Sequence, residues 1–187
     1  MKITGGKFRR LNLRGAPALE GLRPTVRRLR EILFERLASR IEGARFLDLC
    51  AGSGAVGLEA LSRGAAHVTF VESAARACDF IAANLKACGV ARAQGEVREE
   101  EVLNFLRLST ADEGRRWDIA FYDPPYSNDY EPVLEIFGAG AALEPRRGVL
   151  VVEHHCEKRL AETRGVLRRW RVVRQGESCL SFYERRR

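Results

Sequence analysis

The stretch Phe46-Leu-Asp-Leu-Cys-Ala-Gly-Ser-Gly-Ala-Val-Gly-Leu-Glu-Ala-Leu61 contains the signals that decide the fold. Its first residues form a short apolar run typical of a buried strand, and the small residues 51–54 form a tight turn. From Ala55 onward, apolar residues recur with helical spacing. A strand, a glycine loop and a helix in this order predict an open α/β sheet. In such a sheet the loop lies at the carboxyl end of a strand, where a ligand can approach backbone amides.

Two cofactors compete for this loop. Gly52, Gly54 and Gly57 spell GxGxxG, and Glu72 ends the next apolar run twenty residues after Gly52, which is the pattern of a dinucleotide-binding fold. Asp48, however, ends the first strand four residues before Gly52. A carboxylate there repels a pyrophosphate and attracts an ammonium group. S-adenosylmethionine carries an ammonium group and a sulfonium but no phosphate, so the D-x-x-x-G-x-G spacing favours it over NAD.

Both carboxylates also have a purely structural interpretation. Asp48 could serve only as a cap for the helix after the loop, because Asp is a common capping residue. Glu72 could be an ordinary solvated strand end, although its spacing from Gly52 suits hydrogen bonds to two ribose hydroxyls.

The composition predicts a soluble, cytoplasmic protein with one well-buried core. The chain has 187 residues, an ordinary domain size. It shows no long apolar segment, and its amino terminus lacks the apolar run of a signal peptide. The five cysteines, at 50, 78, 88, 156 and 179, are scattered and form no C-x-x-C pair. We therefore expect reduced, small core residues.

The net charge of +7 is unevenly placed. Residues 1–40 hold eleven Lys or Arg against three Glu, whereas residues 41–187 come to a net charge of −1. The planar fork of arginine suits phosphate, so a polyanion is the expected partner of this basic arm, and a merely solvated basic surface is the alternative. We predict a hairpin around Gly5-Gly6 and a helix that opens at 23–25 and ends near Ile41. The candidate nucleic-acid contacts are Lys7, Arg9, Arg10, Arg23, Arg27 and Arg28.

The rest of the chain alternates between strand and helix patterns. Buried strands are expected at 68–72, within 91–98, at 117–122 and at 149–152, with helices over 74–87, 99–108, 131–137 and 157–162. The segments 168–174 and 179–184 alternate like strands and are joined at Gln175-Gly176, which predicts a hairpin. The expected sheet is therefore mostly parallel with an antiparallel edge.

Asp123-Pro124-Pro125-Tyr126 is the most specific motif in the chain. It follows a buried strand, so Asp48, Glu72 and Asp123 should converge on one crevice at the same edge of the sheet. Two prolines lack amide donors and fix φ, which holds the backbone stiff with its carbonyls free. An ordinary strand-terminating turn is the structural alternative.

The motif could methylate an exocyclic amino group on a base. The lone pair of such a nitrogen is delocalised into the ring. If the Asp123 carboxylate and the Pro124 carbonyl accept its two hydrogens, the lone pair can turn toward the sulfonium methyl. Tyr126 offers a flat face on which a flipped-out base can stack.

With these motifs the sequence resembles the RsmD-type family of small-subunit (16S) ribosomal RNA guanine-N2 methyltransferases. The similarity runs through Ile3 to Gly6, Gly21 to Thr25, Arg30 to Phe34, Asp48 to Leu61 and Asp123 to Tyr126. It implies a class I, Rossmann-like methyltransferase fold with a mostly parallel seven-stranded sheet and an antiparallel C-terminal hairpin. Residues 1–40 would form a basic RNA-contacting extension, and residues 41–187 the S-adenosylmethionine-dependent methyltransferase domain.

The resemblance also implies roles for individual residues. Asp48, Ala51, Gly52 and Gly54 would hold the methionine part of the cofactor and Glu72 its ribose. Glu101 would face the adenine, although a solvated acidic run over Glu99, Glu100 and Glu101 explains that segment equally well. The other expected cofactor contacts are Ser53, Val102 and Thr25, and the catalytic set is Asp123, Pro124, Pro125 and Tyr126.

One position departs from the family pattern. The family usually has Asp-Arg after R-P-T-x, and Arg27-Arg28 stands here. This reversal of charge puts the roles of Arg23, Thr25 and Arg28 in cofactor or RNA contact in doubt.

Metal binding is not expected. Glu153-His154-His155-Cys156 contains ligand-type residues, but neighbours on a strand point to opposite faces and cannot all reach one ion.

The expected activity is methyl transfer to N2 of a guanine in small-subunit ribosomal RNA by a monomer. The substrate could be naked RNA, an assembling particle or the complete 30S subunit. The residues alone fit an adenine-N6 or other nucleic-acid amino methyltransferase equally well. An NAD-dependent oxidoreductase and a catalytically silent RNA-binding protein are rivals from other classes.

Overall fold

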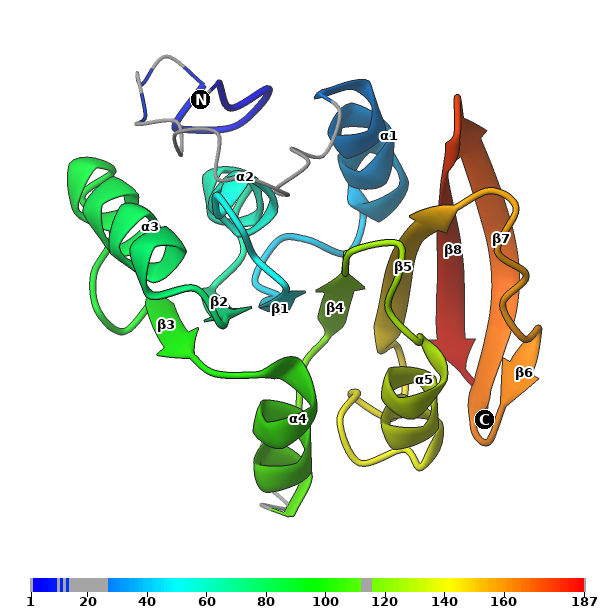
Figure 1. Ribbon diagram of the computed structural model, residues 1–187. Coiled ribbons are helices and arrows are strands. Elements are labelled where there is room, and N and C mark those ends of the chain that lie inside the picture. Colours follow the sequence, from blue (N-terminus) through cyan, green and yellow to red (C-terminus); the bar gives the residue numbers. More distant parts are fainter. Residues whose placement is uncertain (1, 10, 12, 14–26, 112–115, 187) are drawn as a thin grey trace.

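The computed structural model describes residues 2–9, 11, 13, 27–111 and 116–186. Within these residues, eight strands form one sheet in the order β3-β2-β1-β4-β5-β8-β7-β6 (Figure 1). The first five strands are parallel, and the last three are antiparallel to their neighbours. The strands are β1 Arg45–Leu49, β2 His67–Glu72, β3 Gly95–Glu99, β4 Ile119–Tyr122, β5 Val149–His155, β6 Thr163–Arg164, β7 Leu167–Gln175 and β8 Ser178–Arg185.

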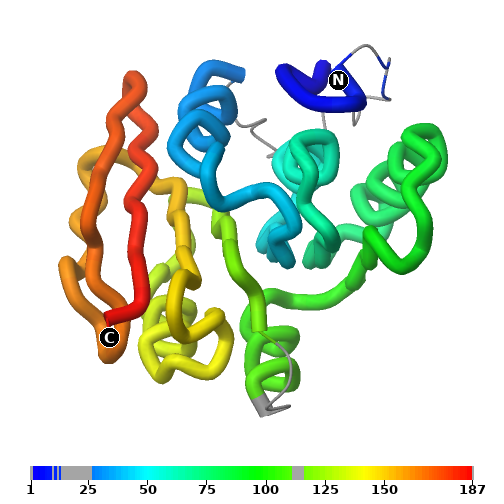
Figure 2. Tube along the Cα trace, turned by 180° about the vertical axis from the view of Figure 1, so that it is seen from behind, coloured from blue at the N-terminus to red at the C-terminus, as the bar shows by residue number. Residues whose placement is uncertain are grey.

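Helices cover both faces of the sheet (Figures 1 and 2). One apolar cluster joins the sheet to α1 (Arg27–Leu37), α2 (Ala55–Ser62) and α3 (Ala75–Ala87). A second cluster joins the opposite face to α4 (Val102–Ala111) and α5 (Glu131–Gly138). Within β1, Phe46 belongs to the first cluster, whereas Leu47 and Leu49 belong to the second. This two-sided burial is what an apolar run in a central parallel strand predicts.

The predicted α/β class, with a mostly parallel sheet and an antiparallel edge, is confirmed. The sheet has eight described strands rather than seven, because Thr163 and Arg164 pair with the start of β7. A two-residue strand has no periodicity that a sequence pattern could reveal. None of the described helices has the length and apolar character needed to cross a membrane.

Two predicted elements are wrong. Residues 2–9, 11 and 13 contain no strand, because this segment bonds to the end of α2 and makes turn bonds within itself. The amides of Lys7 and Phe8 donate to the carbonyl and hydroxyl oxygens of Ser62, at 2.8 and 2.9 Å. The predicted helix over 157–162 is also absent, since residues 156–158 form a turn and 159–161 have no regular structure.

The basic arm is anchored by buried side chains. Ile3, Phe8 and Leu13 lie in the same apolar cluster as α1 and α2. Gly6 has a φ of 73°, and a Cβ there would lie 1.8 Å from the Ser62 carbonyl oxygen, so only glycine fits. The described part of the following helix runs from Arg27 to Leu37, shorter at its end than predicted.

The cysteines do not all remain free thiols. Cys156 and Cys179 form a disulfide between the end of β5 and the start of β8. Cys50, Cys78 and Cys88 are free, as expected. The pair was missed because its proximity depends on the pairing of β5 with β8, where His155 faces Ser178 and His154 faces Cys179.

Candidate active site

The loop after β1 has a backbone conformation that lets neighbouring groups approach it closely. Cys50 has a φ of 58° despite its side chain, and Gly52 and Gly54 also have positive φ. A Cβ on Gly57 would lie 2.3 Å from the Phe70 ring, so the third glycine of the motif allows α2 to pack tightly on β2. The glycines therefore set the position of α2 and its first amides.

Asp48 lies beneath this loop and is 2% exposed. Its Oδ2 accepts a hydrogen bond from the Gly57 amide at 2.8 Å. The capping interaction weighed as an alternative is therefore present. Burial raises the pKa of Asp48 well above its usual range, and the negative charges of Asp123 and Glu72 raise it further. A cation bound beside these three carboxylates would favour the ionised form of Asp48.

Glu72 ties the end of β2 to the glycine loop. Its two carboxylate oxygens accept hydrogen bonds from the amides of Gly52, at 2.7 Å, and Ala74, at 2.9 Å. The residue is 7% exposed, so it is not an ordinary solvated strand end. Each carboxylate oxygen has more than one acceptor site, so both can also accept from a ligand hydroxyl.

Cys50 is unsuited to act as a nucleophile. Burial raises the pKa of its thiol, and the surrounding Glu72, Asp123 and Asp48 raise it further. The thiolate is the reactive form of cysteine, so this environment keeps Cys50 inert.

Asp123 lies next to the end of β1. In the pairing of β1 with β4, Leu49 faces Tyr122, and the Asp123 amide donates to the Leu49 carbonyl at 3.4 Å. After it, Pro124 is buried and Pro125 is exposed. The Pro125 carbonyl accepts from the Asn128 amide at 2.9 Å, which fixes the turn. The carboxyl ends of β1, β2 and β4 thus bring the three predicted carboxylates together.

Tyr126 is held by two residues that the sequence did not indicate. Its hydroxyl lies 2.6 Å from the Ser178 hydroxyl. Its ring meets the His155 ring edge-on, with centroids 5.5 Å apart. His155 and Ser178 face each other across β5 and β8. Only the register of these strands could have identified them.

Tyr130 is a further residue that sequence reasoning missed. It is 1% exposed, and its hydroxyl has no hydrogen-bond partner among the described residues. Burial raises its pKa, and the nearby Asp123 raises it further. Tyr130 therefore keeps its proton and offers a hydrogen-bond donor near the Asp123 carboxylate.

The other predicted cofactor residues lie around the same edge. Ala51 is buried, and its amide donates to Val71 at 3.0 Å. Ser53 is half-buried in the loop, Glu101 is exposed just before α4, and Val102 is 9% exposed. Thr25 lies outside the described residues.

The predicted RNA contacts are less fully described. Lys7 and Arg9 are exposed. Arg27 and Arg28 are exposed on α1, and both pair with Glu31, at 3.0 and 3.4 Å. The single Glu31 carboxylate therefore offsets one of the two positive charges at the position of the charge reversal. Arg10 and Arg23 lie outside the described residues.

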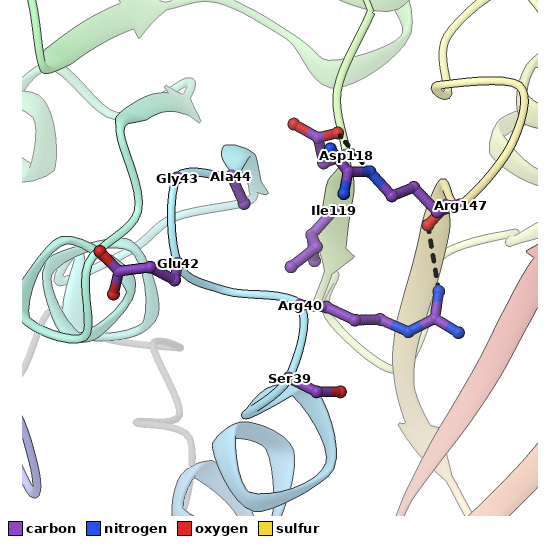
Figure 3. A pocket seen from close by; sticks show the side chains of 8 residues that line it. All are labelled: Ser39, Arg40, Glu42, Gly43, Ala44, Asp118, Ile119 and Arg147. Carbon is purple, nitrogen blue, oxygen red and sulfur yellow. Dashed lines mark hydrogen bonds and ion pairs between the residues drawn. The ribbon is translucent and has the colours of Figure 1, made fainter.

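A pocket of about 80 Å³ lies at the opposite edge of the sheet, at the amino ends of β1 and β4 (Figure 3). Two polar contacts cross it. Arg40 donates to the Arg147 carbonyl at 3.1 Å, and Arg147 lies 3.9 Å from Asp118. The pocket contains none of the predicted site residues.

The side chains of the segment Glu153-His154-His155-Cys156 have separate environments. His154 Nε2 lies 2.8 Å from the Ser181 hydroxyl, His155 contacts Tyr126, and Cys156 is in the disulfide. In the part of the chain that the structure describes, no three ligand-type side chains are grouped to hold a metal ion.

Comparison with known proteins identifies the family. The family model described as "Conserved hypothetical protein 95" matches residues 1–184. Ribosomal RNA small subunit methyltransferase D of Haemophilus influenzae is 35% identical over 163 residues, which are 86% of this chain and 81% of that protein. The chain belongs to this family.

Solved structures agree with the methyltransferase D family. The structure of YhhF, a candidate methyltransferase of Escherichia coli, has a TM-score of 0.85 and 32% identity, covering 100% of this chain and 98% of that one. An S-adenosylmethionine-dependent methyltransferase of Agrobacterium tumefaciens shares the fold, with 18% identity and a TM-score of 0.64 over 89% of this chain and 64% of that one. The family and the methyltransferase fold predicted from the motifs are confirmed.

Proposed function

We propose that this protein transfers a methyl group from S-adenosylmethionine to N2 of a guanine in small-subunit ribosomal RNA. The observation that carries the proposal is the meeting of three carboxylates and the Asp-Pro-Pro-Tyr turn at one edge of the sheet. Family membership supports ribosomal RNA as the substrate. Such a substrate would place the reaction in the cytoplasm.

The acidic environment of the loop fits S-adenosylmethionine. Asp48 is buried beside Asp123 and Glu72, and its burial, together with repulsion from their negative charges, raises its pKa. A ligand with two positive charges relieves this repulsion, whereas the pyrophosphate of NAD would increase it. In this proposal Asp48, Ala51, Gly52, Ser53 and Gly54 surround the methionine part. Glu72 accepts from the ribose hydroxyls, while Glu101, Val102 and Thr25 are the remaining cofactor contacts.

The Asp-Pro-Pro-Tyr turn would hold the amine. Asp123 and the Pro124 carbonyl accept hydrogen bonds from its two hydrogens, which turns the nitrogen lone pair away from the ring. The methylated nitrogen then gives up one of these protons, and the Asp123 carboxylate is placed to take it. Tyr126 supports the base and is itself held by Ser178 and His155. When bound, S-adenosylmethionine supplies a methyl group on a sulfonium. The protein contributes alignment and charge, which account for most of the rate in such a transfer.

The choice of guanine depends on the family and not on the geometry. Adenine N6 presents an amino group of the same kind, so the same turn could hold it. Sequencing or mass spectrometry of the methylated nucleoside distinguishes the two products.

Methyl incorporation into a small-subunit ribosomal RNA transcript tests the proposal. We expect incorporation with the wild type and loss of at least about a hundredfold in Asp123→Ala, the order of magnitude for one catalytic hydrogen-bonding group. RNA affinity should change little in this variant. Full activity of Asp123→Ala would contradict the role of Asp123. No activity in the wild type, with tight RNA binding, would favour a silent RNA-binding protein.

Calorimetry tests the cofactor separately. S-adenosylmethionine should bind the wild type, and NAD should not. The reverse order of affinities would support the oxidoreductase reading.

A further inference from the structure

The carboxyl-terminal hairpin carries a second concentration of positive charge. Residues 163–187 contain eight arginines and two glutamates, a net charge of +6, whereas residues 41–162 have a net charge of −7. Five of these arginines lie in 163–176, a stretch without any acidic residue. The basic character is therefore not confined to the amino-terminal arm.

Local partners compensate three of these five arginines. Arg164 pairs with Glu131, Arg169 lies 3.5 Å from Glu162, and Arg168 faces Glu184 across the strand pair. Each of these three arginines therefore has a glutamate nearby, and Arg164 and Arg169 form ion pairs with theirs.

Arg171 and Arg174 are different. Both are exposed on β7, and they face Phe182 and Cys179 across the strand pair. Among the described residues, no carboxylate pairs with either guanidinium. Arg174 donates to the Gly176 carbonyl, at 3.0 Å. The two arginines are three residues apart in a regular part of β7, so their side chains leave the strand on opposite faces. They can reach one RNA backbone only around the edge of the strand.

The strand that carries them ends beside the candidate active site. Gln175, the last residue of β7, pairs with Ser178, whose hydroxyl lies 2.6 Å from the Tyr126 hydroxyl. Arg174 therefore directly precedes Gln175, the residue paired with Ser178. Arg171 is four residues away, about 13 Å along a strand with a rise of ~3.3 Å per residue. About four stacked nucleotides, at ~3.4 Å each, span the same distance.

The same strand also presents apolar surface and an open edge. Trp170 is 37% exposed and packs on Phe182, and Val172 is 47% exposed. The short strand β6 pairs only with the first two residues of β7. Arginines beside a partly exposed aromatic ring are typical of surfaces that bind single-stranded nucleic acid.

We propose that Arg171 and Arg174 on β7 bind the phosphates of the RNA strand next to the target nucleotide. This inference rests on the proposed function for the location of the target base at Tyr126. The hairpin of β7 and β8 would then bind the RNA backbone beside the active site, on a surface separate from the amino-terminal arm.

The test is RNA binding of the full chain without cofactor, measured by fluorescence anisotropy with a small-subunit ribosomal RNA transcript. For Arg171→Gln/Arg174→Gln we expect about tenfold weaker binding at low salt, from two exposed charge contacts of up to about fivefold each. The slope of log affinity against log salt should fall by about 1.4 to 1.8, because each lost phosphate contact removes about 0.7 to 0.9.

A matched control distinguishes an effect of these two positions from an effect of the lower net charge. Arg92→Gln/Arg107→Gln removes two exposed arginines, one before β3 at the far end of the sheet and one on α4. This variant should bind RNA as the wild type does. Equal losses in both variants, or an unchanged salt slope in the β7 variant, would overturn the proposal.

Arginines on an open strand edge can also serve only to prevent aggregation. Light scattering of the β7 variant decides this point. Aggregation with unchanged RNA affinity of the monomer would contradict RNA contact. Because no methyl transfer is measured, a negative activity assay of the wild type would challenge the proposed function and leave the binding result standing.

Discussion

Asp48 is a carboxylate in a place from which water is excluded. Its position suits a positively charged ligand, but without that ligand it faces Asp123 and Glu72 at close range. Burial and repulsion favour the protonated form, so ionisation of Asp48 costs the folded protein free energy. The site is thus less stable than its packing alone would allow, and the cofactor would supply the missing charge.

Replacing Asp48 by Asn should stabilise the protein and abolish cofactor binding. The folded-state pKa lies above the unfolded value, so the stability linked to this group is complete below the unfolded pKa and declines as pH rises toward the folded pKa. Asn does not titrate and can still accept from Gly57. At pH 7 we expect Asp48→Asn to unfold at a higher urea concentration than the wild type, because the folded variant no longer holds a buried ionisable carboxyl.

The control for this prediction is the pH profile. Below the unfolded pKa the two proteins should have similar stability, and the gap should widen as pH rises. A less stable Asp48→Asn at pH 7, or one that binds S-adenosylmethionine normally, would contradict the role given to this carboxylate.

At the scale of elements, α2 links the glycine loop at its start to the basic arm along its length. Glu59 on α2 is fully buried and pairs with Arg30 of α1 at 2.9 Å and with Arg63 at 2.8 Å. It also accepts a hydrogen bond from the Thr4 amide at 3.1 Å. One carboxylate therefore holds α1, α2 and the first residues of the chain together.

Glu59→Ala should lower the free energy of unfolding by about 3–5 kcal/mol, because removing one partner of a buried pair leaves an uncompensated charge. Arg30 is only 6% exposed, so water can do little to compensate its charge. Glu35→Ala, at an exposed position on α1, is the control and should change stability by less than about 0.5 kcal/mol. A loss below about 1 kcal/mol for Glu59→Ala would show that the cluster is not a structural link.

Patterns local to one element were predictable, and contacts between distant strands were not. The glycine loop, Asp48, Glu72 and the Asp-Pro-Pro-Tyr turn were visible because each combines a strand end with special residues. Their convergence followed from parallel pairing. His155, Ser178 and the Cys156–Cys179 disulfide depend on the register of β5 with β8, which no local pattern specifies.

The prediction of an amino-terminal hairpin was wrong for a related reason. Gly5-Gly6 has the composition of a turn between strands, but Gly6 is needed for contact with Ser62. The glycine pair correctly indicated an unusual backbone, but we interpreted it as a hairpin turn and not as a contact with α2.

The whole molecule has two basic ends around an acidic middle. Residues 1–40 carry +8 and residues 163–187 carry +6, while the segment between them carries −7. The acidic middle includes the carboxylates of the site. This division of charge fits a protein that holds a polyanion at its periphery and a cation at its centre.

We propose that this edge of the sheet methylates N2 of a guanine in small-subunit ribosomal RNA. Mass spectrometry of that RNA, from cells lacking the gene and from the same cells given either wild type or Asp123→Ala, tests it most directly. We predict that one N2-methylguanine disappears with the gene, returns with the wild type and stays absent with Asp123→Ala. An unchanged set of methylated guanines, or a lost methyl on adenine N6 instead, would contradict the account.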